Sequence, residues 1–380
     1  MIPYGRQDIS QADIDAVVDV LKSDFLTQGP AVPAFETAIM AATGAAHALA
    51  VNSATSALHI ACMALDLGPG DILWTVPNTF VASANVGLYC GADVDFVDID
   101  PATYCMCPTA LAAKLDAAAA TDKLPKVLIP VHFAGQSADM AAISALARAH
   151  GIKIIEDASH AIGASYKGAP VGNCAYSDIC VFSFHPVKII TTAEGGVAST
   201  QDAELASKMN LARSHGVTRE PDLMQNESEG GWYYEQVALG YNYRMTEMQA
   251  ALGASQMTRL AEFVTRRNAL ATRYDSLLAD MPVTRPQQNP DAYSAFHLYP
   301  VQVENRAAAF AHLCDNGIGV NVHYIPVHTQ PFWQARGFKR GDFPNAEHYY
   351  DHAISIPLYA GLTDADQDRV VQVLADAAAL

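Results

Sequence analysis

The sequence predicts an α/β fold in which a mainly parallel sheet is followed by a second, smaller domain. Over the first two thirds of the chain, segments with apolar residues at helical spacing alternate with short continuous apolar runs. This alternation is typical of βα units that form a parallel sheet covered by helices. From about Thr246 it gives way to a long helical tract and then to strands interrupted by proline. We therefore expect a large domain over residues 1–250 and a smaller C-terminal domain over residues 251–380.

The elements of the large domain follow from these periodicities. Residues 11–23 have apolar side chains at helical spacing, and residues 139–151 do so up to a glycine that can end a helix. Residues 51–65 run from the end of a strand into a helix. Short, predominantly apolar runs predict buried strands at residues 71–80, 94–100, 126–133, 152–158, 177–184 and 196–200.

The C-terminal part has a different pattern. Residues 246–281 form one long helical tract, and residues 364–380 form a closing helix. The segment 218–236 before this part is polar and rich in glycine and aromatic residues, which predicts a mobile loop.

Composition excludes several classes of protein. The net charge of −17 is spread along the 380 residues, which argues against a nucleic-acid or anionic-membrane partner. It leaves phosphorylated small molecules open, because backbone N–H groups at a helix N-terminus can hold a phosphate. No apolar run approaches the ~20 residues of a transmembrane helix, and the N-terminus lacks the zones of a signal peptide. We expect a cytoplasmic protein.

The cysteines do not suggest a metal site. The seven cysteines form no CxxC pair, and Cys105 and Cys107 are too close together for a common chelate. We expect free thiols and no bound metal.

Lys188 lies in a setting that is uncommon for a lysine. It follows the predicted strand 177–184, and Pro186 prevents that strand from simply continuing. Most lysines are solvated surface groups, and this interpretation stays open here. On a constrained loop beside a core strand, however, a lysine can lose hydration, and a lowered pKa makes its amine a usable nucleophile or base.

Two other features also follow strand ends. Asp157 ends the predicted strand 152–158 and would stand at the carboxyl edge of the sheet, where open α/β sheets bind ligands. Ser53, Ala54 and Thr55 open the helix of residues 51–65, where they could hold a phosphate or simply cap the helix. Together, a lysine, a carboxylate and a helix N-terminus that can hold phosphate suit pyridoxal 5′-phosphate. This cofactor needs a partner for its aldehyde, its ring nitrogen and its phosphate.

Eight segments carry a resemblance that covers essentially the whole chain: LTQGP, NSATSAL, PNTFVASAN, EDASHAIGA, FSFHPVKIITTAEGG, RSHG, GYNYRMTEMQAALG and NVHYIP. With them the chain resembles the DegT/DnrJ/EryC1/StrS sugar aminotransferases, which have the aspartate aminotransferase-like (PLP type I) fold. Within this family the segments are most similar to the aminotransferases of pseudaminic acid biosynthesis. Those enzymes aminate C4 of a UDP-linked 4-keto-6-deoxy-N-acetylhexosamine, so the resemblance implies this substrate, with L-glutamate as the amino donor.

The resemblance also implies a role for individual positions. Lys188 would be the Schiff-base lysine and Asp157 the partner of the pyridinium nitrogen, with His160 beside the ring hydroxyl and Phe80 stacked on the ring. Asn242 would reach the cofactor phosphate of the other subunit, which implies a homodimer with shared active sites. The remaining implied cofactor positions are Ser53, Ala54, Thr55 and Ser183. The implied substrate positions are Tyr4, Asp24, Phe25, Leu26, Thr27, Ala54, Ser183, Asn242, Val322, His323, Tyr324 and Ile325.

Several alternatives stay open from the sequence. Phe80 could belong to the core, His160 could be a satisfied buried histidine, and Tyr4 and His323 could have structural uses. The acceptor could be another nucleotide-linked keto sugar or a cyclitol, and the protein could bind pyridoxal phosphate or a sugar nucleotide only as a regulator. A sugar dehydratase of this family would carry histidine at the position of Lys188. An NAD-dependent dehydrogenase lacks support because no GxGxxG follows an early strand.

Overall fold

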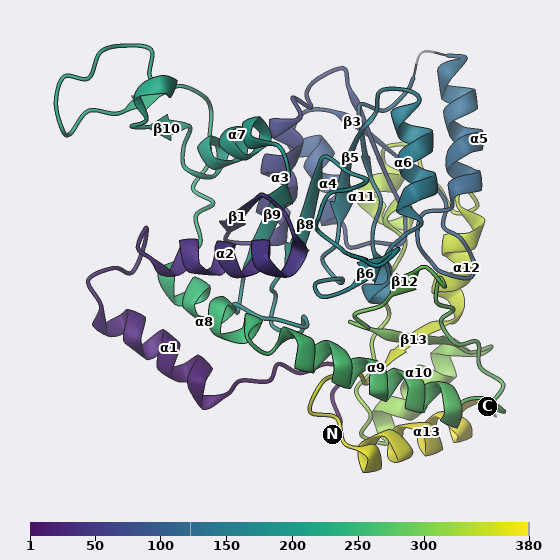
Figure 1. Cartoon of the computed structure of the whole chain (residues 1–380). Coiled ribbons are helices and arrows are strands. Elements are labelled where there is room, and N and C mark those ends of the chain that lie inside the picture. Colours follow the sequence, from purple (N-terminus) through teal and green to yellow (C-terminus); the bar gives the residue numbers. More distant parts are fainter. Residues whose placement is uncertain (122, 379–380) are drawn as a thin grey trace.

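The computed structural model describes residues 1–121 and 123–378 and confirms the α/β fold with a mainly parallel sheet (Figure 1). The central sheet has the order β1-β9-β8-β5-β4-β2-β3. Within it, β9 is antiparallel to β1 and β8, and the other neighbours are parallel. The strands are β1 His47–Val51, β2 Ile72–Thr75, β3 Asp93–Phe96, β4 Val127–Ile129, β5 Lys153–Asp157, β8 Ile179–Ser183 and β9 Gly196–Thr200.

The pairing of the central strand β8 with its neighbours aligns two predicted site residues. Its sequence is a continuous apolar run that ends in serine, and all its residues are buried. Asp157 of β5 pairs with Val181 of β8, and Ser183 at the end of β8 pairs with Gly196. The predicted carboxylate and a predicted phosphate ligand therefore come to the same edge of the sheet.

Helices cover both faces of the sheet. One face packs against α3 Ala54–Ala64, α4 Ala82–Tyr89 and α7 Ala203–Arg213. The other face packs at one end against α2 Ala31–Thr43 and α8 Glu247–Met257. At its other end it packs against α5 Pro108–Ala119 and α6 Met140–Arg148.

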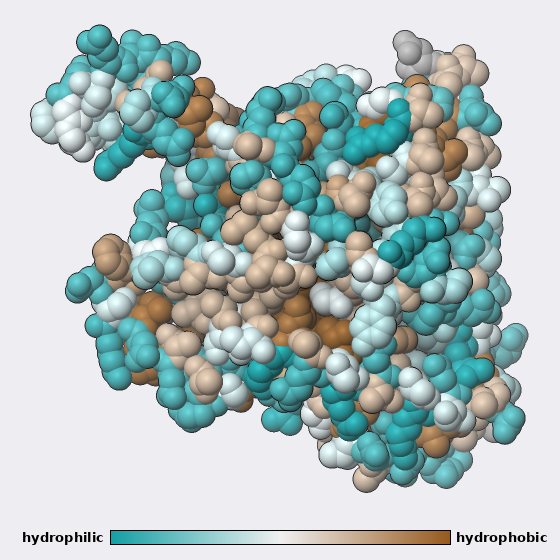
Figure 2. Space-filling view, in the orientation of Figure 1, coloured by the Kyte–Doolittle hydropathy of each residue, from teal (hydrophilic) through white to brown (hydrophobic). Residues whose placement is uncertain are grey.

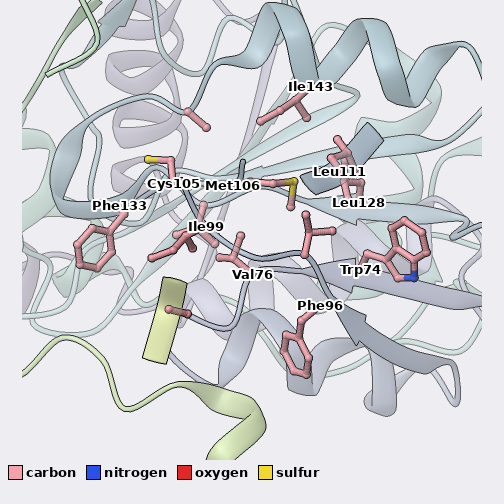
Figure 3. Packing of buried hydrophobic residues seen from close by; sticks show 14 of the residues in the cluster. Trp74, Val76, Phe96, Ile99, Cys105, Met106, Leu111, Leu128, Phe133 and Ile143 are labelled. Carbon is pink, nitrogen blue, oxygen red and sulfur yellow. The ribbon is translucent and has the colours of Figure 1, made fainter. Parts of the chain in front are cut away.

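The core between the sheet and α5 and α6 consists of large apolar side chains. Figure 3 shows Trp74 and Leu128 from the strands beside Leu111 of α5 and Ile143 of α6. Each of these side chains is at most 2% exposed. Burying a side chain of this size contributes about 1.5–3 kcal/mol, so this layer holds the strands that position the site.

The C-terminal part has a core of its own around a two-stranded sheet of β13 Tyr299–Gln302 and β14 Ala353–Ile356. Its helices are α9 Leu260–Leu277, α10 Arg306–Asp315 and α13 Asp364–Ala378, whereas α11 Pro331–Gln334 and α12 Pro344–His352 pack on the core of the central sheet. The N-terminal residues join this part, because Ile2 pairs with Ile318 and the Leu358 N–H donates to the Tyr4 carbonyl at 3.1 Å. The division at residues 250 and 251 stays a prediction.

The predicted helix over residues 11–23 is confirmed as α1 Gln11–Lys22, which begins with a capping box formed by Ser10 and Asp13. The closing helix is α13, and residues 379 and 380 of its predicted span lie outside the described residues.

The helical tract predicted over residues 246–281 is present but consists of two helices. The tract divides into α8 and α9 at Thr258 and Arg259, where bonds to the carbonyls three residues earlier tighten the end of α8. The Arg259 guanidinium bonds to the carboxylates of Asp8 and Asp13, both at 2.8 Å. These contacts to the N-terminal segment fix the break, and local periodicity could not reveal them.

The predicted loop 218–236 forms most of an arm that projects from the body near β10 (Figure 1). The arm is held by short strands, β10 Val217–Thr218 and β11 Glu235–Gln236. Figure 2 shows that its surface is mainly hydrophilic, although Trp232 is 71% exposed. Its mobility stays a prediction.

Within the described ranges, 1–121 and 123–378, the helices include none long and apolar enough to cross a membrane. The same residues contain no group of His, Cys, Asp and Glu side chains placed to hold a metal ion. All seven cysteines are free thiols, as the sequence predicted.

Candidate active site

A cavity of about 560 Å³ lies at the carboxyl edge of the central sheet. It is lined by residues that follow β1, β2, β4, β5 and β8, and it is closed by Tyr4 from the N-terminus and residues 321–324 from the C-terminal part. The predicted site residues that line it are Tyr4, Ser53, Ala54, Thr55, Phe80, Asp157, His160, Ser183, Lys188, Val322, His323 and Tyr324.

Asp157 is fixed at the floor of this cavity and is only 5% exposed. Its Oδ1 accepts from the Ser159 hydroxyl at 2.5 Å and from the Ser159 N–H at 3.1 Å. Its Oδ2 accepts from the Ser83 hydroxyl at 2.7 Å, and Ser83 is bonded in turn to the Thr79 hydroxyl at 2.8 Å. Donors on both oxygens set the direction of the carboxylate toward the cavity.

Lys188 lies on the loop after β8 with its side chain half-buried in the cavity wall. The loop folds back on itself, because the Phe184 N–H donates to the Gly195 carbonyl and the Thr192 N–H donates to the Phe184 carbonyl, both at 2.9 Å. Burial lowers the pKa of Lys188 to about 7, although the charge of Asp157 acts in the opposite direction. The amine is therefore partly unprotonated near neutral pH.

The N-terminus of α3 faces the same cavity. The Ser53 side chain caps the helix by accepting from the Ser56 N–H at 3.1 Å. The N–H groups of Ala54 and Thr55 belong to the first turn and have no partner within the helix, so they can bind an anion. β9 begins directly against this turn, because a Cβ added to Gly196 would lie 2.4 Å from the Ala54 nitrogen.

Two buried histidines, His160 and His323, lie near Lys188. His160 Nδ1 accepts from the Ala134 N–H at 3.3 Å, so its proton is on Nε2, which donates to the Tyr324 hydroxyl at 3.0 Å. His323 Nδ1 bonds to the Ser355 hydroxyl at 2.8 Å. Burial and the charge of Lys188 lower the pKa of His160 well below its ordinary value and that of His323 to about 3. These imidazoles are therefore neutral hydrogen-bonding groups.

Six of the predicted site residues do not line this cavity in the part of the chain that the structure describes. Residues 24–27 are exposed between α1 and α2, where Phe25 is 52% and Leu26 50% exposed. Ile325 is 47% exposed. Asn242 is exposed as well, and its carbonyl accepts from the Asn52 side-chain amide at 3.5 Å.

The structure also brings in residues that the sequence analysis missed. Ser83 and Ser159 orient Asp157, and His297 bonds to the Lys188 amine. Ser159 could have been found, because it stands two residues after Asp157, a spacing at which a side chain commonly bonds to a nearby carboxylate. Ser83 and His297 reach the site only through the tertiary fold.

Comparison with known proteins identifies the family. The model of the "DegT/DnrJ/EryC1/StrS aminotransferase family" matches residues 7–375. The spore coat polysaccharide biosynthesis protein SpsC of Bacillus subtilis is 39% identical, over 99% of this chain and 96% of SpsC.

Two solved structures share the fold. Spr1654 of Streptococcus pneumoniae, assigned as a sugar aminotransferase and solved in its PMP-form, superposes with a TM-score of 0.93 at 30% identity over 100% of this chain and 99% of that one. Helicobacter pylori PseC, an aminotransferase involved in the biosynthesis of pseudoaminic acid, gives 0.91 at 31% identity over 99% and 98%. The chain therefore belongs to the DegT/DnrJ/EryC1/StrS family and is an aminotransferase.

Proposed function

We propose that the protein transfers an amino group from L-glutamate to the C4 ketone of a UDP-linked 4-keto-6-deoxy-N-acetylhexosamine. Pyridoxal 5′-phosphate is the cofactor of this family. The observation that carries the proposal is the convergence of the Lys188 amine, the Asp157 carboxylate and the N-terminus of α3 on one cavity. The product is a 4-amino sugar nucleotide, which we assign to pseudaminic acid biosynthesis in the cytoplasm.

The cavity fits pyridoxal phosphate, which supplies an aldehyde that captures amines and a ring that accepts carbanion charge. Asp157 would hold the ring nitrogen, and its donors leave it directed at the cavity. The first turn of α3 and the Ser183 hydroxyl would hold the phosphate. Phe80, which is 59% exposed, would lie against the ring, and His160 would lie beside the ring hydroxyl.

Lys188 would hold the cofactor covalently until the amino donor replaces it. The freed amine, with a pKa of about 7, would then take a proton from Cα of glutamate and deliver it to the C4′ carbon of the cofactor. Water would then release the carbon skeleton as 2-oxoglutarate, and the amino group would stay with the cofactor. In the second half-reaction, Lys188 would move a proton in the opposite direction, and the amino group would pass to C4 of the keto sugar, whose ketone oxygen would leave as water.

The sugar nucleotide would contact the part of the cavity that lies toward the C-terminal part. Tyr4, Val322, His323 and Tyr324 line this side. The involvement of PseC in pseudoaminic acid biosynthesis, at 31% identity over nearly the whole chain, supports the pseudaminic acid substrate. The name of SpsC, at 39% identity, supports a second candidate, a different nucleotide-linked keto sugar that supplies a coat polysaccharide.

We also propose a homodimer with shared active sites. Of the described residues that line the cavity, Lys188 is the only lysine or arginine, whereas glutamate and UDP bring several negative charges. Asn242 is exposed and outside the cavity of its own chain. A second copy that places its Asn242 at the cofactor phosphate would complete the site.

Absorbance spectroscopy tests this function. The protein with pyridoxal phosphate should show the yellow band of the cofactor bound to Lys188. L-glutamate should bleach this band, and the UDP-linked 4-keto sugar, freshly made by a dehydratase, should restore it. Bleaching without restoration by this sugar would exclude the proposed acceptor, and a Lys188→Ala variant that turns over would exclude the proposed role of Lys188.

A further inference from the structure

His297 is the buried histidine whose function the family assignment leaves open. It lies between β12 Ala292–Tyr293 and β13, is 5% exposed and lines the cavity. Its Nε2 lies 3.4 Å from the Lys188 Nζ atom. Its Nδ1 is buried and has no hydrogen-bond partner among the described residues. Among the described residues, the Lys188 amine is thus the one group that forms a hydrogen bond with this imidazole.

The backbone, rather than the ring, fixes the position of His297. Arg267 of α9 is 2% exposed and donates through Nη1 to the carbonyls of Phe296 at 3.1 Å, His297 at 3.3 Å and Leu358 at 3.0 Å. A Cβ added to Gly135, which has φ +106°, would lie 2.8 Å from the His297 nitrogen, so this segment packs tightly on the loop after β4. The backbone of His297 is therefore fixed whether or not its ring is bonded to Lys188.

The ring is also held in its neutral form. Burial lowers the pKa of His297 well below its ordinary value, and the charges of Lys188 and Arg267 act in the same direction. The centroid of the His160 ring lies 4.4 Å from that of His297, which limits the movement of the ring on that side. A neutral imidazole with its proton on Nδ1 presents Nε2 as an acceptor to the lysine amine.

We propose that His297 is a positioning residue for Lys188. Its Nε2 accepts a hydrogen bond from the Lys188 amine once that amine is free of the cofactor, and the bond becomes stronger when the amine carries the transferred proton. This bond would fix the position of the freed amine in the cavity. The inference rests on the proposed function for its role in turnover, but the bond itself can be tested in the protein without cofactor.

The first test compares His297→Gln with His297→Met in cofactor-free protein. The two side chains are similar in length and volume, but only glutamine offers a strong acceptor. An amine-labelling reagent, trinitrobenzenesulfonate, would be used across a range of pH, with the labelled Lys188 peptide quantified by mass spectrometry. In the Met variant the apparent pKa of Lys188 should fall by roughly one unit, because the ammonium loses a hydrogen bond, and the Gln variant should stay near the wild type.

The second test measures the half-reaction of the cofactor-loaded variants with L-glutamate. His297→Met should slow it about tenfold and raise the isotope effect of α-deuterated glutamate, because a mispositioned amine makes proton transfer limiting. His297→Gln should recover most of the rate. A Met variant that matches the wild type in both tests would overturn the proposal, as would a Gln variant as impaired as the Met variant. If His297→Met does not fold, as judged by thermal melting, His297→Leu replaces it.

These outcomes separate the two proposals. If Lys188 did not hold the cofactor, the wild type would lack the yellow band while labelling would still show the bond to His297. If only the role of His297 were wrong, the wild type would show the band and the Met variant would label like the wild type.

Discussion

Removing the Ser83 hydroxyl should impair catalysis more than removing the Ser159 hydroxyl. Both hydroxyls donate to Asp157. The Ser83 hydroxyl is the donor to Oδ2, at 2.7 Å, so Ser83→Ala removes this bond. Ser159→Ala removes the hydroxyl bond to Oδ1, but Oδ1 would keep its bond from the backbone N–H of residue 159 at 3.1 Å. Hydrogen bonds to charged groups contribute about 1.5–3 kcal/mol, which corresponds to roughly 10- to 150-fold in rate if the whole contribution acts in the transition state. We expect this loss for Ser83→Ala and a loss of no more than roughly tenfold for Ser159→Ala.

The assay is the single-turnover reaction with L-glutamate at saturating pyridoxal phosphate, so that weaker cofactor binding does not enter the rate. Thermal melting of both variants checks that the fold is retained. A Ser159→Ala variant slower than Ser83→Ala, or two variants at the wild-type rate, would refute the assignment of Asp157 as a carboxylate oriented by these donors.

Four further predictions concern the active site and the buried contacts that hold it in place. The half-reaction with glutamate should slow as the pH falls through about 7, because Lys188 becomes protonated and cannot accept a proton, and a rate that is flat across this range would contradict its role as the base. Asp157→Asn should retain some cofactor but lose most activity, which single-turnover kinetics would show. Gly196→Ala should weaken pyridoxal phosphate binding about tenfold in a spectroscopic titration, because its Cβ would lie 2.4 Å from the Ala54 nitrogen, whereas Gly68→Ala, whose Cβ meets nothing within 4 Å, should bind normally. Arg267→Met should lower the free energy of unfolding by at least about 3 kcal/mol in urea titrations, because three buried carbonyls lose their donor, and an unchanged midpoint would contradict this.

The sequence was sufficient to predict the parts of the site that depend on local pattern. Asp157 ends a buried strand, Ser53 caps a helix, and Lys188 follows another strand, so the edge rule for parallel sheets brings them together. The structure places all three around one cavity.

The parts that could not be predicted depend on contacts between distant segments. His297 is 109 residues from Lys188, and Ser83 is 74 residues from Asp157. The break between α8 and α9 depends on the ion pairs of Arg259 with the N-terminal segment, since the apolar periodicity continues across it. No periodicity encodes such pairings.

The placement of Asn242 and residues 24–27 outside the cavity has a different cause. Their roles were implied by the family resemblance, and the cavity of a single chain does not test them. They stay predictions, and that of Asn242 depends on the proposed second copy.

The central claim, that Lys188 holds the cofactor, is tested most directly by trapping the bond. The protein loaded with pyridoxal phosphate would be reduced with borohydride, digested and mapped by mass spectrometry. We predict that the reduced cofactor is found on the peptide that contains Lys188 and that prior addition of L-glutamate abolishes the labelling. Cofactor attached to another lysine, or no covalent adduct in a protein that binds pyridoxal phosphate, would contradict this account.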